Sequence, residues 1–339
     1  MGGVHHYRIP WQLIPVYDFL CRCVLCVWPS RGKGHHDRMV SLLYKVRHSL
    51  PLTHTVYTVT AASQKAYLTS HSARTETLIL GTSHALFGYK AAGEECNLGV
   101  PSCDLYSMER LFERVLPAAP GLKRLVLFFS PFSSGFTIQR SSVALFVSPL
   151  LNVLWNIGYN PRGRVTAESL SNQEQMASFI RNKEKSLVLT LEEIWGLFRA
   201  LVFPASCQDI LRSRESRDRY RRSKATVVRS SLENSELPFF YGILRRAAAH
   251  GIKVYLVLPP FHEVYRELFS AHCFFRHLSL AVRNFENVAV LDYFSDASFG
   301  ENDFADPEHL NAQGAQKLTL KIRTAIRALE DTHKAGVTP

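Results

Sequence analysis

Features typical of metal, nucleotide and repeat proteins are missing from this 339-residue sequence. The seven cysteines are an odd number, and only Cys21, Cys23 and Cys26 lie close together, so no second cluster completes a zinc site. There is no Gly-x-Gly-x-x-Gly or Walker sequence, and we therefore expect no metal and no nucleotide cofactor. Internal repeats and low-complexity tracts are absent. We interpret the cysteines as free thiols of a reducing compartment, with an oxidised extracellular domain as the alternative.

Long hydrophobic runs are also scarce, and residues 11–28 form the only candidate membrane segment. Its 18 residues barely span a bilayer, and Asp18 and Arg22 near its middle would be costly in lipid. No small-x-small cleavage site follows it, so a signal peptide is not indicated. We interpret the segment as an amphipathic or interfacial helix, with a poor membrane anchor as the alternative. The expected location is cytoplasmic or membrane-associated, in a protein of bacterial type.

Acidic residues are in deficit, since 29 Asp and Glu face 40 Lys and Arg and leave a formal charge of +11. This surplus favours anionic partners. Part of it gathers in one segment, at Arg212, Arg214, Arg217, Arg219, Arg221, Arg222, Lys224 and Arg229. The cluster is either a solvated helix face partly neutralised by Glu215 and Asp218, or a surface that contacts an anionic polymer or acidic membrane. No nucleic-acid module is present, so no specific nucleic acid is expected as a partner.

Short apolar runs alternate with helical patterns from residue 74 onward. The expected strands are 77–81, 97–100, 124–130, 253–260 and 287–294. Their near-continuous Val, Leu, Ile and Phe content is typical of parallel strands covered on both faces. Helical spacing is found over 103–117, over 237–250 with Gly251 as a C-cap, and over 311–330. The sequence therefore predicts an α/β fold, namely a three-layer α/β/α sandwich with a flavodoxin-like parallel sheet of five strands in the order 2-1-3-4-5.

Three parts are expected in this chain. Residues 1–73 form a helical or irregular preamble that contains no strong strand signal. Residues 74–138 and 237–332 together form the α/β domain. The intervening 139–236 segment carries helical patterns, such as that of 186–203, and is interpreted as a helical insertion on the sheet.

Ser83 follows the first expected strand, where the chain turns into a helix. A serine there is either a helix N-cap or a nucleophile beside the positive end of the helix. Asp306 and His309 lie three positions apart, just before a helix expected to start at Asn311. A carboxylate at this spacing can fix the tautomer of the imidazole. The first and last strands of a 2-1-3-4-5 sheet end along the same edge, so Ser83 and His309 could meet.

Three short motifs resemble those of the SGNH (GDSL-like) hydrolase superfamily. They are Gly-x-Ser at 81–83, Asn-Leu-Gly at 97–99, and Asp-x-x-His-Leu-Asn-x-x-Gly-Ala at 306–315. The resemblance covers roughly residues 75–135 and 250–330, and Gly-Thr-Ser-His is closer to the Gly-x-Ser-His variants of envelope-polysaccharide acyltransferase-like members. Members of the superfamily are esterases, lipases, and enzymes that transfer or remove acetyl groups of cell-envelope glycans.

The resemblance implies that Ser83 is the nucleophile, His309 the general base and Asp306 its orienting partner. The backbone N–H groups of Ser83 and Gly99 would form two legs of an oxyanion hole, and glycine allows the close backbone approach that this needs. The third donor of the family is an asparagine after the third strand. The loop at 130–136 has no asparagine, and Ser130, Ser133 or Ser134 is the expected substitute.

Two further histidines need a role. His84 follows Ser83 and should point away from it on a helix, so we expect a structural or substrate-contacting role. His262 follows the fourth strand on the same predicted edge, where it is either a satisfied loop residue or a substrate contact.

The sequence thus predicts an SGNH-like serine esterase or O-acyltransferase. It would act on an acylated sugar or glycan through an acyl-serine intermediate. The alternative is a catalytically degenerate protein of this fold that binds an anionic polymer or membrane surface through its basic insertion.

Overall fold

The computed structural model describes residues 52–141, 144–160, 167–183, 210, 213–269, 278–279 and 283–334. The expected interfacial helix at 11–28, the helical pattern at 186–203, Arg212 and the cysteines at positions 21, 23 and 26 lie outside the described residues. Everything below concerns the described part.

Five parallel strands form one sheet in the order β2-β1-β3-β4-β5, as the sequence predicts. They are β1 (Thr77–Leu80), β2 (Glu95–Asn97), β3 (Arg124–Phe128), β4 (Lys253–Leu258) and β5 (Val288–Asp292). All four residues of β1 are buried, and so are four of the five in β3. Continuous burial explains the unbroken apolar runs in the sequence, because a parallel sheet has helices on both faces.

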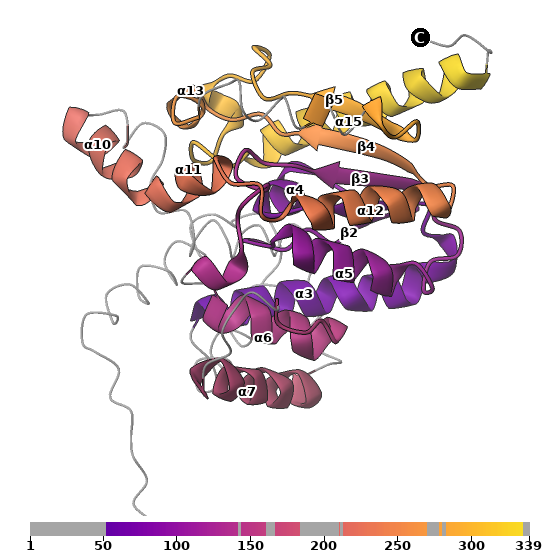
Figure 1. Ribbon diagram of the computed structural model, residues 1–339, viewed down its shortest axis with the longest axis horizontal. Coiled ribbons are helices and arrows are strands. Elements are labelled where there is room, and N and C mark those ends of the chain that lie inside the picture. Colours follow the sequence, from indigo (N-terminus) through magenta and orange to yellow (C-terminus); the bar gives the residue numbers. More distant parts are fainter. Residues whose placement is uncertain are drawn as a thin grey trace, which may run out of the picture.

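The side chains of each strand alternate between two cores. Leu78, Leu125 and Leu256 point into the larger core, which also contains residues of α3 (Leu52–His71), α5 (Leu105–Val115) and α12 (Leu237–Ala249). Ile79, Val126 and Val257 point into the other core, which is covered by α15 (Ala312–Lys334). Figure 1 shows the resulting layers, with α3, α5 and α12 on one side of the sheet and α15 on the other. The α/β sandwich is therefore confirmed.

Helix α3 lies before residue 74, where the α/β domain was expected to begin. Its side chains Tyr57, Val59, Ala61 and Leu68 are nevertheless buried in the larger core. The weak helical periodicity of this stretch gave no sign of that packing. Residues 52–71 are thus part of the same packed unit as the sheet.

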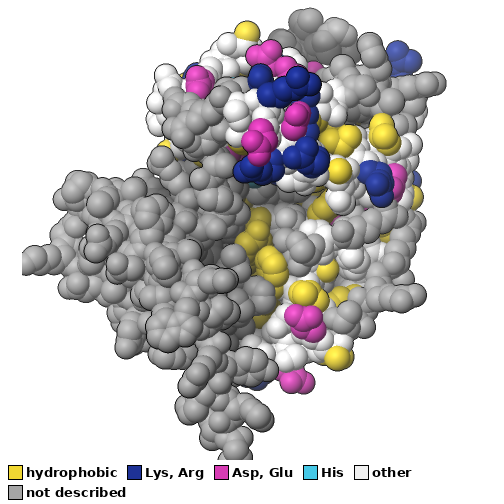
Figure 2. Space-filling view, turned by 90° about the vertical axis from the view of Figure 1, so that its left-hand side faces the viewer, with side chains coloured by type: hydrophobic (Ala, Val, Ile, Leu, Met, Phe, Trp, Pro, Cys, Tyr) yellow, Lys and Arg dark blue, Asp and Glu magenta, His cyan; other side chains and the backbone are white. Residues whose placement is uncertain are grey.

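The described residues between β3 and α12 form helices and no strand. The helices are η3 (Ile138–Arg140), α6 (Ala144–Trp155), α7 (Ala167–Lys183), α10 (Arg214–Ser223) and α11 (Ala225–Ser231). Helix α10 buries none of its residues and projects from the body of the molecule (Figure 1). Figure 2 shows basic and acidic side chains gathered above a hollow whose visible wall carries hydrophobic side chains. Within the described part of the chain, no helix is long and apolar enough to cross a membrane.

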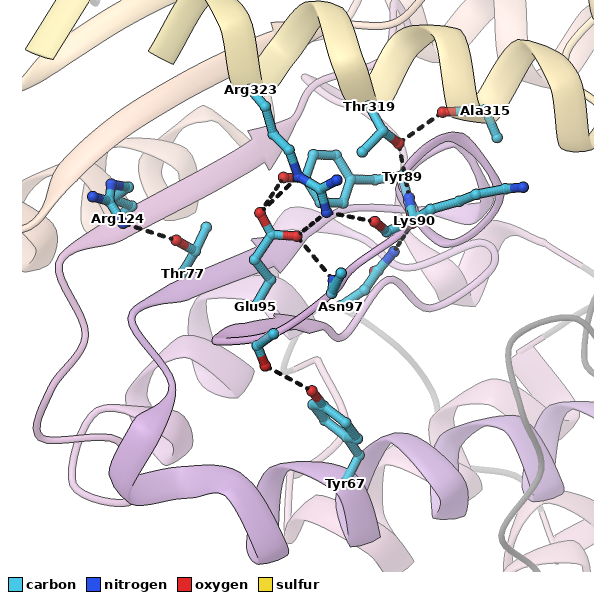
Figure 3. Close-up of polar contacts among 12 residues, drawn as sticks. Tyr67, Thr77, Tyr89, Lys90, Glu95, Asn97, Arg124, Ala315, Thr319 and Arg323 are labelled. Carbon is cyan, nitrogen blue, oxygen red and sulfur yellow. Dashed lines mark hydrogen bonds and ion pairs between the residues drawn. The ribbon is translucent and has the colours of Figure 1, made fainter. Parts of the chain in front are cut away.

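A polar network fastens α15 to the β2 edge of the sheet (Figure 3). Arg323 Nε donates to Glu95 Oε1 at 3.0 Å, and Tyr89 OH donates to the same oxygen at 2.9 Å. Lys90 N donates to Thr319 Oγ1 at 2.9 Å. The network holds the short segment between α4 (Ser83–Gly88) and β2 against the last helix. It thereby fixes the helix that begins with Ser83.

Candidate active site

Thr82 and Ser83 occupy different positions in the turn between β1 and α4. Thr82 is the N-cap of α4, and its Oγ1 accepts a hydrogen bond from the backbone N–H of His84 at 3.3 Å. Gly81 has a φ of +154°, and a Cβ there would lie 2.7 Å from Phe128 Cβ, so the tight turn requires glycine. Ser83 is the first helical residue and only half-buried. Its hydroxyl is therefore not needed as a cap.

The Asn-Leu-Gly segment at the end of β2 holds α4 in place. Asn97 Nδ2 donates to the carbonyl oxygens of Ala85 within the helix and of Tyr89, its C-cap, both at 2.9 Å. A Cβ on Gly99 would lie 2.5 Å from the backbone nitrogen of Leu86, which shows how closely the two backbones approach. Asn97 is consequently a positioning residue for the helix that carries Ser83.

Asp306 and His309 lie on a compact loop that leads into α15. The loop is closed by an antiparallel bridge between Phe304 and Leu310, and Ala305 N donates to His309 O at 2.8 Å. Asn311 Oδ1 then accepts from the N–H groups of Gln313 and Gly314 at the start of the helix, at 2.9 and 3.0 Å. The residues between the aspartate and the helix therefore serve to hold the histidine in position.

The structure brings Ser83, His309 and Asp306 into one hydrogen-bonded chain. Ser83 Oγ lies 2.8 Å from His309 Nε2. His309 Nδ1 lies 2.9 and 3.0 Å from the two carboxylate oxygens of Asp306. Since His309 Nδ1 faces a carboxylate, we place the proton of the neutral imidazole on Nδ1. Nε2 then has a lone pair that can accept the proton of the Ser83 hydroxyl.

Asp306 is buried but remains in its charged form. Burial alone would raise its pKa. The attraction to His309, together with hydrogen bonds from His309 and from the backbone N–H groups of Glu308 and His309, lowers the pKa by more than burial raises it. The pKa of Asp306 is therefore lowered below its ordinary value. A carboxylate in this state can stabilise a positively charged imidazole.

A cavity of about 740 Å³ opens in front of Ser83, and we call it the Ser83 cavity. Ser83, His84, Asp306 and His309 all line it. The remaining lining residues come from the body of the protein (Tyr57, Thr82, Phe87, Pro101, Ser102, Phe132, Phe136, Ser141, Pro307, Glu308) and from residue 210, α10, Lys224 and α11 (Ile210, Ser216, Arg219, Tyr220, Ser223, Lys224, Val227). The volume suits a ligand much larger than water.

His84 is buried beside the site rather than exposed within it. Its Nδ1 lies 2.6 Å from Ser130 Oγ and 3.1 Å from Thr82 Oγ1, and its ring stacks on that of His309 with centroids 5.1 Å apart. Burial holds the pKa of His84 well below its ordinary value, and electrostatic interactions with His309 and Lys224 act in the same direction. A neutral ring that packs against His309 fits the structural role expected for this residue.

Three of the expected site residues do not line the Ser83 cavity. The N–H of Gly99 donates to Asn97 Oδ1 at 2.9 Å, so it is already engaged. Ser133 Oγ accepts from Ser130 N at 3.0 Å. His262 caps α13 (Glu263–Arg266) through Nδ1, and its own N–H donates to Pro307 O at 3.1 Å. Burial is the largest influence on His262 and lowers its pKa.

The sequence did not indicate the aromatic residues of the cavity or the contact between the insertion and the loop that carries His309. Phe132 and Phe136 lie in the loop after β3, which contains no asparagine. Lys224 forms an ion pair with Glu308, and Tyr220 OH donates to the same carboxylate at 3.3 Å. The four-residue spacing of Tyr220 and Lys224 could have indicated that the two side chains lie side by side. Nothing in the sequence indicated that Glu308 would be their partner.

Ser102 lies on the cavity wall in an uncommon conformation. Its φ is +57°, which non-glycine residues seldom adopt because their Cβ is crowded there.

In the described residues, no group of His, Cys, Asp and Glu is arranged to hold a metal ion. The arrangement is that of an α/β protein with a serine, a histidine and an aspartate at the carboxyl edge of a parallel sheet. No model of a known protein family matches the chain, and no curated protein matches its sequence.

Proposed function

We propose that this protein is a serine esterase or O-acyltransferase of the SGNH type, acting on an acylated sugar or glycan. The observation that carries the proposal is the 2.8 Å contact between Ser83 Oγ and His309 Nε2, with Asp306 at Nδ1 of the same imidazole. A serine is a weak nucleophile unless a base takes its proton, and this geometry provides one. The half-buried position of Ser83 on a cavity supports access by a substrate.

The reaction has two steps, acylation and deacylation of Ser83, and His309 transfers the proton in both. Ser83 Oγ attacks the acyl carbonyl carbon and its proton passes to His309 Nε2. When the ester C–O bond breaks, His309 returns the proton to the leaving alcohol, and the acyl group stays on Ser83. Water or a sugar hydroxyl then attacks the acyl-serine, loses its proton to His309 and releases Ser83. The backbone N–H of Ser83 is the donor that we assign to the developing oxyanion, because those of His84, Ala85 and Leu86 already donate to Thr82.

Labelling with a fluorophosphonate probe tests the proposal. The wild-type protein should be labelled at Ser83, Ser83→Ala should not be labelled, and His309→Ala should react at least about 10³-fold more slowly. Ser223→Ala is the matched control, because Ser223 also lines the cavity, but its hydroxyl donates to the carbonyl oxygen of Tyr220 at 2.7 Å and not to His309. Equal labelling of all four proteins would contradict the proposed roles.

The alternative, a protein that only binds an anionic polymer or membrane surface, has one observation in its favour. Arg217, Arg222 and Arg229 are exposed, and none forms an ion pair with the described acidic residues. Elution from a heparin column compares the wild type with the triple Gln variant of these arginines. Earlier elution of the variant, together with no labelling of Ser83 in the wild type, would favour the alternative.

A further inference from the structure

The residues that line the Ser83 cavity differ according to the element that supplies them. Phe87 of α4 and the loop residues Phe132 and Phe136 provide aromatic rings, and the last two meet edge to face with centroids 5.4 Å apart. Helix α10 and the residue after it provide hydroxyl and cationic groups instead. A substrate that fills the cavity therefore meets apolar surface at Phe87, Phe132 and Phe136, and hydroxyl and cationic groups on α10.

The polar groups that α10 supplies lie on one face of the helix, and Lys224 directly after it continues the same spacing. Ser216, Arg219, Tyr220, Ser223 and Lys224 follow the i, i+3, i+4, i+7, i+8 spacing that puts residues on one face. Arg214, Arg217 and Arg221 do not line the cavity. The basic segment is thus divided into an outer set and a cavity set.

Charges within the cavity are matched in pairs, with one exception among the described lining residues. Asp306 binds His309, and Glu308 binds Lys224 with side chains only 12% and 25% exposed. Arg219 instead pairs with Glu215, which does not line the cavity, through exposed side chains on successive helix turns. Such exposed pairs contribute little free energy, so a ligand can replace Glu215 as the partner of Arg219.

The Ser216 hydroxyl lies beside the Arg219 guanidinium. Ser216 precedes Arg219 by three positions, which makes the two side chains neighbours on the helix surface. Its Oγ accepts a hydrogen bond from Ser213 Oγ at 3.0 Å, so its own hydrogen remains to be donated. A guanidinium with an adjacent hydroxyl donor is a chemistry suited to phosphate and carboxylate groups.

We propose that the ester cleaved by Ser83 carries an anionic group, a phosphate or a carboxylate, which Arg219 binds with the help of Ser216. The acyl chain of that ester lies against Phe87, Phe132 and Phe136. This inference rests on the proposed function, and it narrows the substrate from any acylated carbohydrate to an anionic one. The cavity of about 740 Å³ has room for both parts of such a molecule.

Two matched pairs of esters test the inference. One pair is 1-butyrylglycerol and its 3-phosphate, and the other is an O-acetylated methyl galactoside and the corresponding O-acetylated galacturonate. The measured quantity is the ratio of kcat/KM for the anionic ester to that for the neutral ester. In the wild type the ratio should exceed one for at least one pair, and Arg219→Gln should lower it by about tenfold or more. The pair that responds identifies the anion.

Arg217→Gln is the matched control, because it removes the same charge from the same helix at a residue outside the cavity. Its ratio should stay within about twofold of the wild type, as expected for an exposed charge. An equal fall in both variants, or a wild-type ratio of one or less for both pairs, would overturn the inference while leaving ester cleavage at Ser83 intact. Absence of any ester cleavage and of any fluorophosphonate labelling would instead overturn the proposed function itself.

Discussion

Two neighbouring hydroxyl groups, on Thr82 and Ser83, have different partners at the start of α4. The Thr82 hydroxyl caps the helix, and the Ser83 hydroxyl contacts His309. The sequence alone left open whether Ser83 was a cap, because serine is common at that position. The structure assigns the cap to Thr82, and Ser83 lies on the wall of the Ser83 cavity.

Replacement of Asp306 by asparagine should weaken both the fold and the reaction. Asp306→Asn should lower the free energy of unfolding by about 2 kcal/mol near neutral pH, because a buried carboxylate that accepts several hydrogen bonds is lost. The rate of acylation should fall by about 10³-fold or more, since His309 loses the group that fixes its tautomer. Urea unfolding and fluorophosphonate labelling measure the two effects.

The difference in stability should depend on pH in a defined direction. The pKa of Asp306 is lowered in the folded protein, so its contribution is present above the pKa of the unfolded chain and disappears as the pH falls through the folded value. The free energies of wild type and Asp306→Asn should therefore converge in acid, as the pH falls below the lowered pKa of Asp306 in the folded protein. A constant difference between neutral and acid pH would show that the carboxylate charge contributes nothing.

Gly99 offers a second test at the residue scale. Gly99→Ala puts a Cβ 2.5 Å from the backbone nitrogen of Leu86, and the free energy of unfolding should fall by about 1–3 kcal/mol. Gly300→Ala is the control, because nothing lies within 4 Å of a Cβ there and no positive φ is required. Equal stability of the two variants in urea would mean that the close approach of the β2 exit to α4 is not tight.

At the scale of elements, α10 contacts the loop that carries His309. The helix buries none of its residues, and Glu308, next to His309, binds both Tyr220 and Lys224. The insertion therefore contacts the loop between β5 and α15 directly. Its position and that of His309 are linked through one carboxylate.

Glu308→Gln should loosen α10 by removing the ion pair with Lys224. Amide hydrogen exchange in α10 should become about fivefold faster, because the pair is largely shielded from water. Glu267→Gln breaks the more exposed pair with Arg221, with both side chains about half exposed, and should change exchange little. The outcome that contradicts this linkage is the same exchange rate in the two variants.

Much of the element order could be predicted because buried parallel strands leave a strong signal. The runs around Leu78, Val126 and Val257 are apolar on both faces, and the Asp306–His309 spacing is local in sequence. The contribution of α3 to the core could not be predicted, since its apolar residues do not form one clear stripe. The engaged N–H of Gly99 and the contact of Glu308 with α10 depend on three-dimensional packing, which leaves no periodic pattern.

For the molecule as a whole, two buried thiols should report global unfolding. Burial raises the pKa of Cys96 to about 12 and that of Cys103 well above its ordinary value, and both residues lie in the larger core. Iodoacetamide at mildly alkaline pH should therefore leave both unmodified in the native protein and modify both after denaturation, as mass spectrometry can measure. Rapid modification of either thiol in native protein would indicate local opening of the β2 side of the sheet.

The 226 positions between Ser83 and His309 have a consequence for the order of events during synthesis. A ribosome delivers the serine and the first three strands long before the strand and loop that carry the base. A growing chain carries the Ser83 hydroxyl before His309 has been added to accept its proton, and α15 follows the last strand along the chain. Polypeptides interrupted before residue 309 would thus be inert toward esters. Under the function proposed above, each chain acquires its activity only at the end of folding.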